Sequence, residues 1–278
     1  MSRRGARIAR LAIGVALILG ACDRPALAAC EFAAQGDGRV SSVLDAKTFR
    51  LDDGREVRLA GIELAADSTD RGKAMLASLI GGRDVSLHGA DDTPDRYGRQ
   101  PAFVALKGSV TPIQFEMLMQ GEALASPTVS DLACSRALRA AEAAARAAGR
   151  GIWTGSAALK NAESADDILA RLGRFTVVEG TATSARLAGA TFYVNFGRRW
   201  TRDFAVTISR RMMPSVEAAG IDLKSLKGKR VRIRGWIEKR GGPRIEVTHA
   251  GQIEVMGAAR PIAGDLAVKE NVPEDEGK

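Results

Sequence analysis

Apolar and polar residues alternate along two separate stretches of the chain, with the period of two that marks half-buried β-strands. In the first stretch these runs are short, and segments with the apolar spacing of helices lie among them. Asp52-Asp53-Gly54-Arg55, between two of the runs, has the Asp-Gly signature of a hairpin turn. The predicted strands are 39–44, 48–51, 56–62, 84–87 and 102–106, and the predicted helices are 71–80, 113–120 and 135–148.

The second alternating stretch follows toward the C-terminus. Its predicted strands are 175–186, 191–196, 203–208, 229–239, 244–249 and 252–255, and a short helix is predicted at 214–219. Three strands, a helix and two further strands is the order of a barrel of the oligonucleotide-binding (OB) type, and five short strands with interspersed helices also suit such a barrel. The fold class we expect is therefore α+β, mainly β, with one OB barrel carrying packed helices and a second, smaller OB-like barrel.

A short pattern occurs once in each stretch. In the first stretch the pattern consists of Gly38, then Thr48 to Leu51, then Gly54-Arg55. In the second it consists of Gly180, then Thr191 to Val194, then Gly197-Arg198, with one inserted residue. Two related barrels would produce this echo. The shared needs of two β-hairpins would produce it as well, and the sequence leaves both explanations open.

The N-terminal segment has the layout of an export signal. Four arginines within 3–10 precede an apolar run at 11–21. That run is too short for a bilayer, which needs about 20 residues, but it suits the core of a signal peptide. Ala26-Leu27-Ala28 has the Ala-x-Ala pattern that suits cleavage before Ala29, whereas Leu19-Gly20-Ala21-Cys22 resembles a lipoprotein box with a lipid on Cys22. We expect a periplasmic or secreted protein without a transmembrane span, with the lipoprotein and a retained anchor as alternatives.

Two cysteines, Cys30 and Cys134, remain if residues 1–28 are removed. A pair of cysteines in an exported protein indicates a disulfide. By the chain-entropy estimate, a link closing a loop of this size stabilises the fold by about 4–5 kcal/mol. Two unrelated thiols are the alternative, because the sequence does not show that the two sulfurs meet.

The composition excludes several chemistries. The chain is 45% apolar and 27% charged, which is ordinary for globular domains. Its two histidines, His88 and His249, leave no paired-histidine metal site, and its three cysteines form no CxxC motif. No glycine-rich phosphate loop or dinucleotide fingerprint is present. Any chemistry must therefore use arginine, lysine, carboxylates and aromatic rings.

Positive charge is concentrated in the second stretch. Residues 29–155 carry 15 basic and 17 acidic residues, whereas residues 172–257 carry 16 basic and 7 acidic residues, a net charge of +9. Residues 156–171 are interpreted as a linker, and the acidic tail 258–278 is expected to be disordered. The basic domain is thus the candidate for an anionic partner.

Four ordered blocks in the first domain carry a family resemblance. They are Val43 to Thr48, Val57 to Glu63, Asp95-Arg96-Tyr97-Gly98-Arg99, and Glu142 through Gly151-Ile152-Trp153. Together they resemble the staphylococcal nuclease (thermonuclease) family across about 36–155. The resemblance implies an OB barrel with packed helices, and an activity that cleaves DNA and RNA phosphodiesters with Ca²⁺.

By this resemblance, Arg58 and Arg99 match the two arginines that donate hydrogen bonds to the phosphate in the family. Two interpretations remain open. The arginines grip a phosphate, or they serve only as ion-pair partners of Glu63, Asp45 or Asp95.

The family's carboxylates are not matched. Lys47 stands where a metal-binding aspartate is expected, and Ala66 stands where the family has its catalytic glutamate. An ammonium group repels a divalent cation instead of binding it. Asp45 and Glu63 remain as candidate metal ligands, and Glu63 and Asp67 as candidate catalytic carboxylates. We expect Ca²⁺-dependent cleavage of the family type to be impaired, so Ca²⁺ is an expected cofactor only if the protein is catalytic.

The basic domain combines arginines with aromatic residues, as single-strand-binding barrels do. Phe192, Val194 and Phe196 alternate as a core stripe, and Tyr193 and Trp200 lie off that stripe, where they are candidates for stacking. Between Lys229 and Arg234 the basic residues alternate with Val and Ile, which predicts one charged and one core face. The candidate nucleic-acid-binding residues are Tyr193, Arg198, Arg199, Trp200, Arg202, Lys229, Arg230, Arg232 and Arg234.

The sequence therefore predicts a protein that binds single-stranded nucleic acid or another polyanion. An active Ca²⁺-dependent endonuclease that uses Arg58, Arg99 and shifted carboxylates is one alternative. An envelope protein-interaction module is the other. The oligomeric state is not predicted.

Overall fold

The computed structural model describes residues 30, 32–65, 69–155 and 158–257. The expected signal peptide with Cys22, the positions Ala66 and Asp67, and the acidic tail lie outside the described residues. None of the described helices has the length and apolar character needed to cross a membrane.

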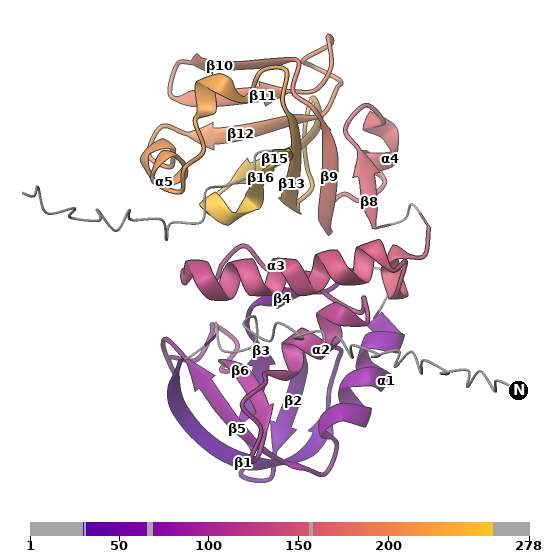
Figure 1. The fold of residues 1–278 in the computed structure, drawn as a ribbon, viewed down its shortest axis with the longest axis vertical. Coiled ribbons are helices and arrows are strands. Elements are labelled where there is room, and N and C mark those ends of the chain that lie inside the picture. The colour runs from indigo at the N-terminus through magenta and orange to yellow at the C-terminus, as the bar shows by residue number, and fades with distance from the viewer. Residues whose placement is uncertain (1–29, 31, 66–68, 156–157, 258–278) are drawn as a thin grey trace, which may run out of the picture.

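The first domain is a closed five-stranded barrel, drawn in indigo and purple in Figure 1. Its strands follow each other around the barrel in the order β1-β2-β3-β6-β5, and β3 and β6 run parallel while the other neighbours are antiparallel. Alternate residues of these strands fill a core that includes Phe49, Leu59 and Leu87. The strands are β1 (Ala33–Val43), β2 (Thr48–Leu51), β3 (Glu56–Leu59), β5 (Asp84–Gly89) and β6 (Gln100–Leu106).

Helices cover this barrel, as the sequence predicted. The predicted strand 56–62 ends at Leu59, and a separate two-residue strand follows after a turn. This short strand pairs with another short strand, which comes after the second helix in the sequence. The helices are α1 (Thr69–Ile80), α2 (Ile113–Met119) and α3 (Leu132–Ala147), followed by the 3₁₀ turn η2 (Gly151–Trp153), and the short pair is β4 (Ile62–Glu63) with β7 (Leu124–Ala125).

The second domain repeats this strand order. β9 pairs with β13, β14 pairs with β15, and the sheet β10-β11-β12-β15-β14 contains one parallel pair, β12 with β15. When β9–β10 and β13–β14 are each counted as one bent strand, the order in which neighbouring strands pair around the second domain, its strand circuit, is the same as in the first barrel. The strands are β9 (Phe175–Thr181), β10 (Ser184–Ala188), β11 (Thr191–Asn195), β12 (Ala205–Ser209), β13 (Arg230–Trp236), β14 (Glu238–Arg240), β15 (Gly242–Val247) and β16 (Ile253–Val255).

Short helices close the second domain, and the α+β, mainly-β fold class is confirmed. The segment predicted as a linker differs from the expectation, because residues 156–171 contain a strand, β8, and a helix, α4. β8 pairs with β9 and therefore extends the second sheet. These elements are β8 (Leu159–Asn161), α4 (Ala165–Leu169), α5 (Met213–Ala218), and the 3₁₀ turns η3 (Leu223–Leu226) and η4 (Ala250–Gln252).

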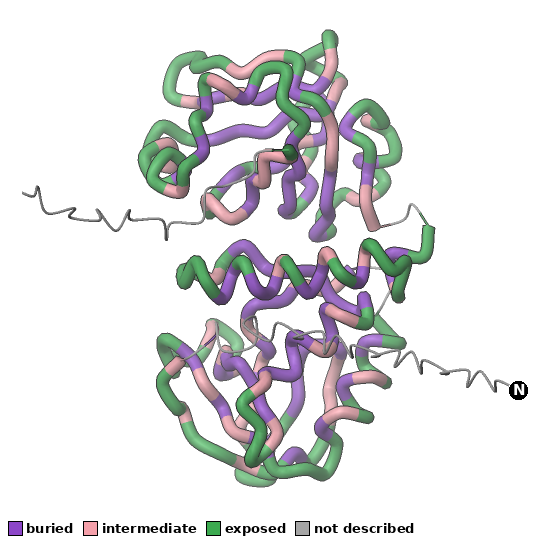
Figure 2. Tube along the Cα trace, in the orientation of Figure 1, coloured by how far each residue is buried: buried purple, intermediate pink, exposed green. Residues whose placement is uncertain are grey.

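Helix α3 lies between the two barrels (Figure 1). Figure 2 shows buried positions all along this helix. Its Glu142 receives two hydrogen bonds from the guanidinium of Arg234 on β13, at 2.8 and 3.1 Å. The same guanidinium donates to the carbonyl oxygen of Ala125, at 2.9 Å. A buried ion pair therefore joins the second barrel to the helix and the strand that cover the first.

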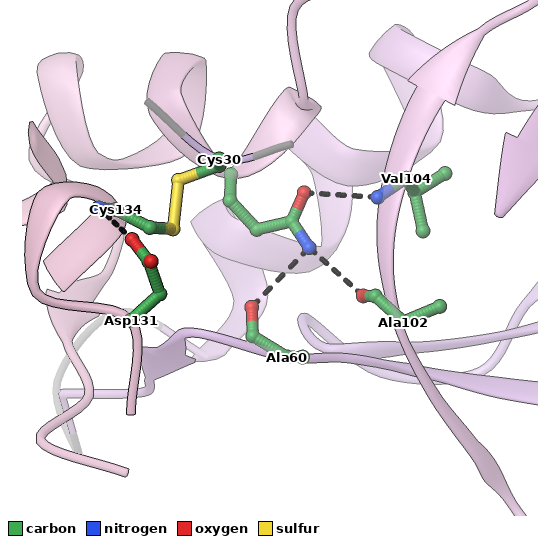
Figure 3. The surroundings of a disulfide bond; sticks show 7 residues. Cys30, Ala60, Ala102, Val104, Asp131 and Cys134 are labelled. Atoms are coloured by element: carbon green, nitrogen blue, oxygen red, sulfur yellow. Dashed lines mark hydrogen bonds between the residues drawn. A yellow bond between two sulfur atoms is a disulfide. The ribbon is translucent and has the colours of Figure 1, made fainter. Parts of the chain in front are cut away.

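The structure joins the sulfurs of Cys30 and Cys134, which are 104 residues apart in the sequence (Figure 3). Cys134 lies in the first turn of α3, where its backbone N–H donates to the side chain of Asp131, the N-cap of the helix. The link therefore ties the segment that precedes β1 to the start of the interdomain helix.

Candidate nucleic-acid interface

Lys47 lies in the turn between β1 and β2, and its side chain points into the protein. Asp45 shapes this turn, because its Oδ1 accepts a hydrogen bond from the backbone N–H of Lys47, at 2.7 Å. Lys47 is only 4% exposed. Its Nζ lies 2.9 Å from Oε2 of Glu63 on β4, so the ammonium group forms a hydrogen-bonded ion pair inside the barrel wall.

Burial is the main influence on the pKa of Lys47, and it lowers the pKa below the usual lysine value. The carboxylate of Glu63 opposes this effect, while the nearby Arg58 adds to it. The lysine is thus held in a partly desolvated position in which its charge is balanced chiefly by Glu63.

Both carboxylate oxygens of Glu63 have a partner in the protein. Besides Lys47, it accepts a hydrogen bond at Oε1 from Ser126 Oγ, at 3.3 Å. A Ca²⁺ ion needs six to eight oxygen ligands and a net negative site. The described donor set does not fit that requirement, because the carboxylate of Glu63 is already paired with the buried ammonium group of Lys47. Among residues 30–257 that the structure describes, no group of three or more His, Cys, Asp or Glu side chains is arranged to hold a metal.

Arg58 has a different environment from its predicted partner Arg99. It lies on β3, half-buried, opposite Thr48 on β2 and Pro101 on β6. Within the described part of the chain, its guanidinium has no hydrogen bond and no ion pair. The described contacts therefore do not support the interpretation that Arg58 is only an ion-pair partner of Asp45 or Glu63, and they give none of its five N–H donors an acceptor.

Arg99, by contrast, is paired. Its Nε and Nη2 donate to Oδ2 of Asp95, at 2.9 and 2.7 Å. Chiefly through these hydrogen bonds, Arg99 lowers the pKa of Asp95 to about 2. The guanidinium also lies 4.9 Å from the ring centroid of Tyr97, which is exposed. Tyr97 was not singled out as a site residue, although it stands inside the family motif, and it holds Arg96 as well as Arg99 against its ring.

The structure corrects the prediction that Arg232 and Arg234 lie on a solvated basic face. Arg234 is 2% exposed and pairs with Glu142, and Arg232 pairs with Glu179 and Glu254. The alternation along this strand does separate two faces. The face that was predicted to be in solvent is instead covered by α3 and by acidic residues of neighbouring strands. A two-residue period predicts that a strand has two different faces, but it does not predict what covers each face.

The other predicted basic residues are exposed. Arg230 is exposed, although Glu179 pairs with it, and Lys229 donates to Ser225 Oγ, at 2.8 Å. Arg198, Arg199 and Arg202 lie in the exposed loop between β11 and β12.

Trp200 is at the centre of that loop and is 72% exposed. The loop is anchored at both ends by a ring contact between Phe196 and Phe204, with centroids 5.2 Å apart. As predicted, Phe192, Val194 and Phe196 are core residues, and Tyr193 is off the core stripe.

Tyr193 and Trp200 line the same groove, a hollow of about 480 Å³ on the second barrel. Three arginines that were not predicted as site residues, Arg186, Arg240 and Arg244, also line it. The sequence held a signal for Arg186, because this residue lies opposite Tyr193 in the β10–β11 hairpin. Arg244 enters through the parallel pairing of β12 with β15, which no local pattern indicates.

Comparison with known proteins identifies the first domain. Residues 57–155, 99 of the 278 residues, match the family described as "Staphylococcal nuclease homologue". Arg58, Glu63 and Arg99 lie within the match, while Lys47 and the whole second barrel lie outside it. No curated protein matches the chain.

Proposed function

We propose that this protein binds single-stranded nucleic acid, or a similar phosphodiester polyanion, without the Ca²⁺-dependent cleavage typical of the staphylococcal nuclease family. The family match over residues 57–155 supports the substrate class. The finer claim, that the ligand is held and not cut, rests on the geometry around Lys47.

The observation that carries the proposal is the ion pair between Lys47 Nζ and Glu63 Oε2, at 2.9 Å. A metal at this place would have to displace a buried ammonium group from its carboxylate, and would then face the positive charges of Lys47 and Arg58. Without the cation, no Lewis acid stabilises the charge that develops on the phosphate in the transition state. A phosphodiester in its ground state has no such requirement, so binding persists.

Arg58 supplies the phosphate contact in the first barrel. A half-buried guanidinium without an internal partner gains more from a phosphate than a solvated surface arginine does, because charge-assisted hydrogen bonds strengthen where water is scarce. The second barrel adds long-range attraction through its net charge of +9 over residues 172–257.

The test is fluorescence anisotropy of a labelled single-stranded oligonucleotide, with the chain from Ala29 onward, titrated at several salt concentrations with Ca²⁺ and with EDTA. We expect binding in both media, and a log Kd that depends linearly on log salt because counterions are released. Arg58→Ala should weaken binding and reduce the slope by about 0.7, the value for one phosphate contact on a single strand.

Arg83→Ala is the matched control. It removes the same charge from an exposed position between α1 and β5, at the end of the barrel next to Val40, away from the turn that holds Lys47. If the two variants weaken binding equally, Arg58 contributes only through its positive charge and not through a specific phosphate contact. Absence of binding at low salt would contradict the proposal and favour the protein-interaction module, whereas binding that requires Ca²⁺ would favour the active nuclease.

We further propose that the protein is exported and cleaved before Ala29. The paired cysteines Cys30 and Cys134 support this, since structural disulfides persist in oxidising compartments. N-terminal sequencing of the protein from a cell-envelope fraction should begin at Ala29. A lipid-modified N-terminus at Cys22 would show the lipoprotein form instead.

A further inference from the structure

We propose that the groove of the second barrel lined by Tyr193, Trp200, Arg186 and Arg244 binds an unpaired base of a single-stranded nucleic acid together with its adjoining phosphate. This inference rests on the proposed function and adds to it a specific site in the part of the chain that the family match does not cover. The rings would stack on the base, and the guanidinium groups would receive the phosphate.

The floor of the groove is the outer face of the sheet β10-β11-β12-β15-β14. The inner face of this sheet packs into the core through Val194, Val206 and Ile245. On the opposite face, the strand register places Tyr193 directly across from Arg186. The same face carries Arg244, which lies opposite Ala205 of the parallel neighbour strand. This face of the sheet thus presents Tyr193 beside Arg186, with Arg244 two strands farther along, beyond β12.

Trp200 forms the wall of the groove. It comes from the β11–β12 loop, and its ring is 72% exposed even though the loop is anchored by Phe196 and Phe204. An exposed tryptophan contributes no core packing. Placed beside a tyrosine over a hollow of about 480 Å³, it offers a second face against which a planar ring can stack.

The charges of the groove favour an anion. Arg186, Arg240 and Arg244 have no ion-pair partner in the part of the chain that the structure describes. The carboxylate that lines the groove, Asp203, accepts a hydrogen bond at Oδ2 from the backbone N–H of Arg199, at 2.7 Å. Three guanidinium groups therefore face one carboxylate that is already engaged.

Arg244 gives a second, independent sign of a ligand. Its Nε is buried and has no hydrogen-bond partner in the structure. A buried donor without a partner is costly, and native proteins satisfy nearly all of them. If the side chain turns toward the groove, this N–H can donate to an acceptor oxygen bound there, and a phosphate offers such oxygens in the fork geometry that a guanidinium prefers.

A polymer fits better than a free nucleotide, because the basic residues extend beyond the groove. Arg198, Arg199 and Arg202 continue along the same loop that carries Trp200. They are placed to meet the phosphates that flank a base seated in the groove. A duplex does not offer its bases for stacking, so single strands should bind more tightly.

The test measures Kd of the chain from Ala29 onward for a labelled oligonucleotide, with Trp200→Ala as the main variant and Trp236→Ala as its matched control. Both tryptophans are largely exposed, but Trp236 contacts Phe175 and lies outside the groove. We expect Trp200→Ala to weaken binding about ten-fold, the effect of losing one stacked base, and Trp236→Ala to leave Kd within about two-fold. Arg244→Gln, which removes the charge and keeps a polar side chain, should also weaken binding.

An abasic oligonucleotide of equal length keeps every phosphate and removes the rings. It should bind the wild type more weakly than the normal strand does, and should bind Trp200→Ala and the wild type equally. If the wild type binds the normal strand but Trp200→Ala and Arg244→Gln do not weaken binding, the groove is not the site and the inference fails, while the proposed function stands. If the wild type binds neither strand, the proposed function fails as well. Tight binding of a free nucleoside monophosphate with no binding of the oligonucleotide would also overturn the inference.

Discussion

The two barrels share a strand circuit but differ in how their charged side chains are used. In the first barrel, Lys47 is paired with Glu63 and Arg99 with Asp95, whereas the guanidinium of Arg58 has no partner among the residues that the structure describes. In the second barrel, Arg186, Arg240 and Arg244 line one groove beside two aromatic rings and have no ion pair among the described residues. The same topology thus carries one cluster of cations that is mostly paired with carboxylates and one groove whose arginines have no ion pair among the described residues.

This difference shows that the fold and the site are specified separately. The strand circuit follows from alternating apolar positions and turns, which both barrels have. The chemistry depends on single side chains at the ends of strands. In the turn after β1, for example, Lys47 forms an ion pair with Glu63 of β4. Resemblance of the fold therefore transfers the ligand class more safely than it transfers the reaction.

The largest expected effect comes from removing the disulfide, which is present in the first barrel and absent from the described part of the second. All three cysteines precede the second barrel, and Cys30–Cys134 joins residues 104 positions apart within the first. Replacing both with serine should lower the free energy of unfolding by about 4–5 kcal/mol on the chain-entropy estimate. Urea unfolding of the variant and the wild type measures this value, and a difference below about 1 kcal/mol would show that the link contributes little beyond the packing of α3.

The second prediction concerns a variant that removes the buried ion pair between the two barrels. Arg234→Ala leaves Glu142 buried without its main partner, and such a loss costs about 3–5 kcal/mol. Arg230→Ala is the control on the same strand, where the exposed guanidinium pairs with Glu179, and it should cost about 1 kcal/mol or less. If the two variants were equally stable in urea, the interface would not depend on the buried pair.

The third prediction concerns pH. Burial alone would raise the pKa of Glu142, but Arg234 and the backbone N–H of Ala125 outweigh burial and lower it in the folded protein. Because the unfolded chain then binds more protons, the stabilising contribution of this carboxylate is complete above its ordinary pKa. It is lost as the pH falls through that value toward the folded pKa.

The double variant Glu142→Leu/Arg234→Met is the measurement for this third effect. Apolar replacement of a whole buried pair is often close to neutral in stability. We expect a stability near that of the wild type at neutral pH, and a smaller loss of stability than the wild type between about pH 5 and pH 3. If the double variant loses as much stability as the wild type when the pH falls, carboxylates other than Glu142 cause the acid sensitivity.

Much of the fold could be predicted from the sequence, because its signals are local. The hairpin at Asp53-Gly54 and the stripe of Phe192 and Val194 depend only on turn chemistry and a period of two. The covering of β13 could not be predicted in this way. Arg234 and Glu142 are 92 residues apart, and no spacing rule indicates that a helix of one barrel lies on a strand of the other.

The candidate site shows the same division. The resemblance predicts that Lys47 stands in place of a metal-binding aspartate, but its ion pair with Glu63, 16 residues later, depends on the close packing of a turn against β4. Arg58 and Arg99 were equivalent in the sequence, and only the contacts distinguish them, because Arg99 pairs with Asp95 and Arg58 has no partner among the described residues. Asp67, the shifted carboxylate considered for catalysis, lies outside the described residues and stays a prediction.

The most direct test of the account is a cleavage assay that uses the chain from Ala29 onward and an end-labelled single-stranded oligonucleotide on a denaturing gel, with Ca²⁺ and with EDTA. Arg58→Ala serves as the control. We predict an intact oligonucleotide in every lane, under conditions in which anisotropy shows that the wild type is bound. Cleavage that requires Ca²⁺ and disappears in Arg58→Ala would show that Lys47 and Glu63 do not prevent catalysis, and would contradict the account.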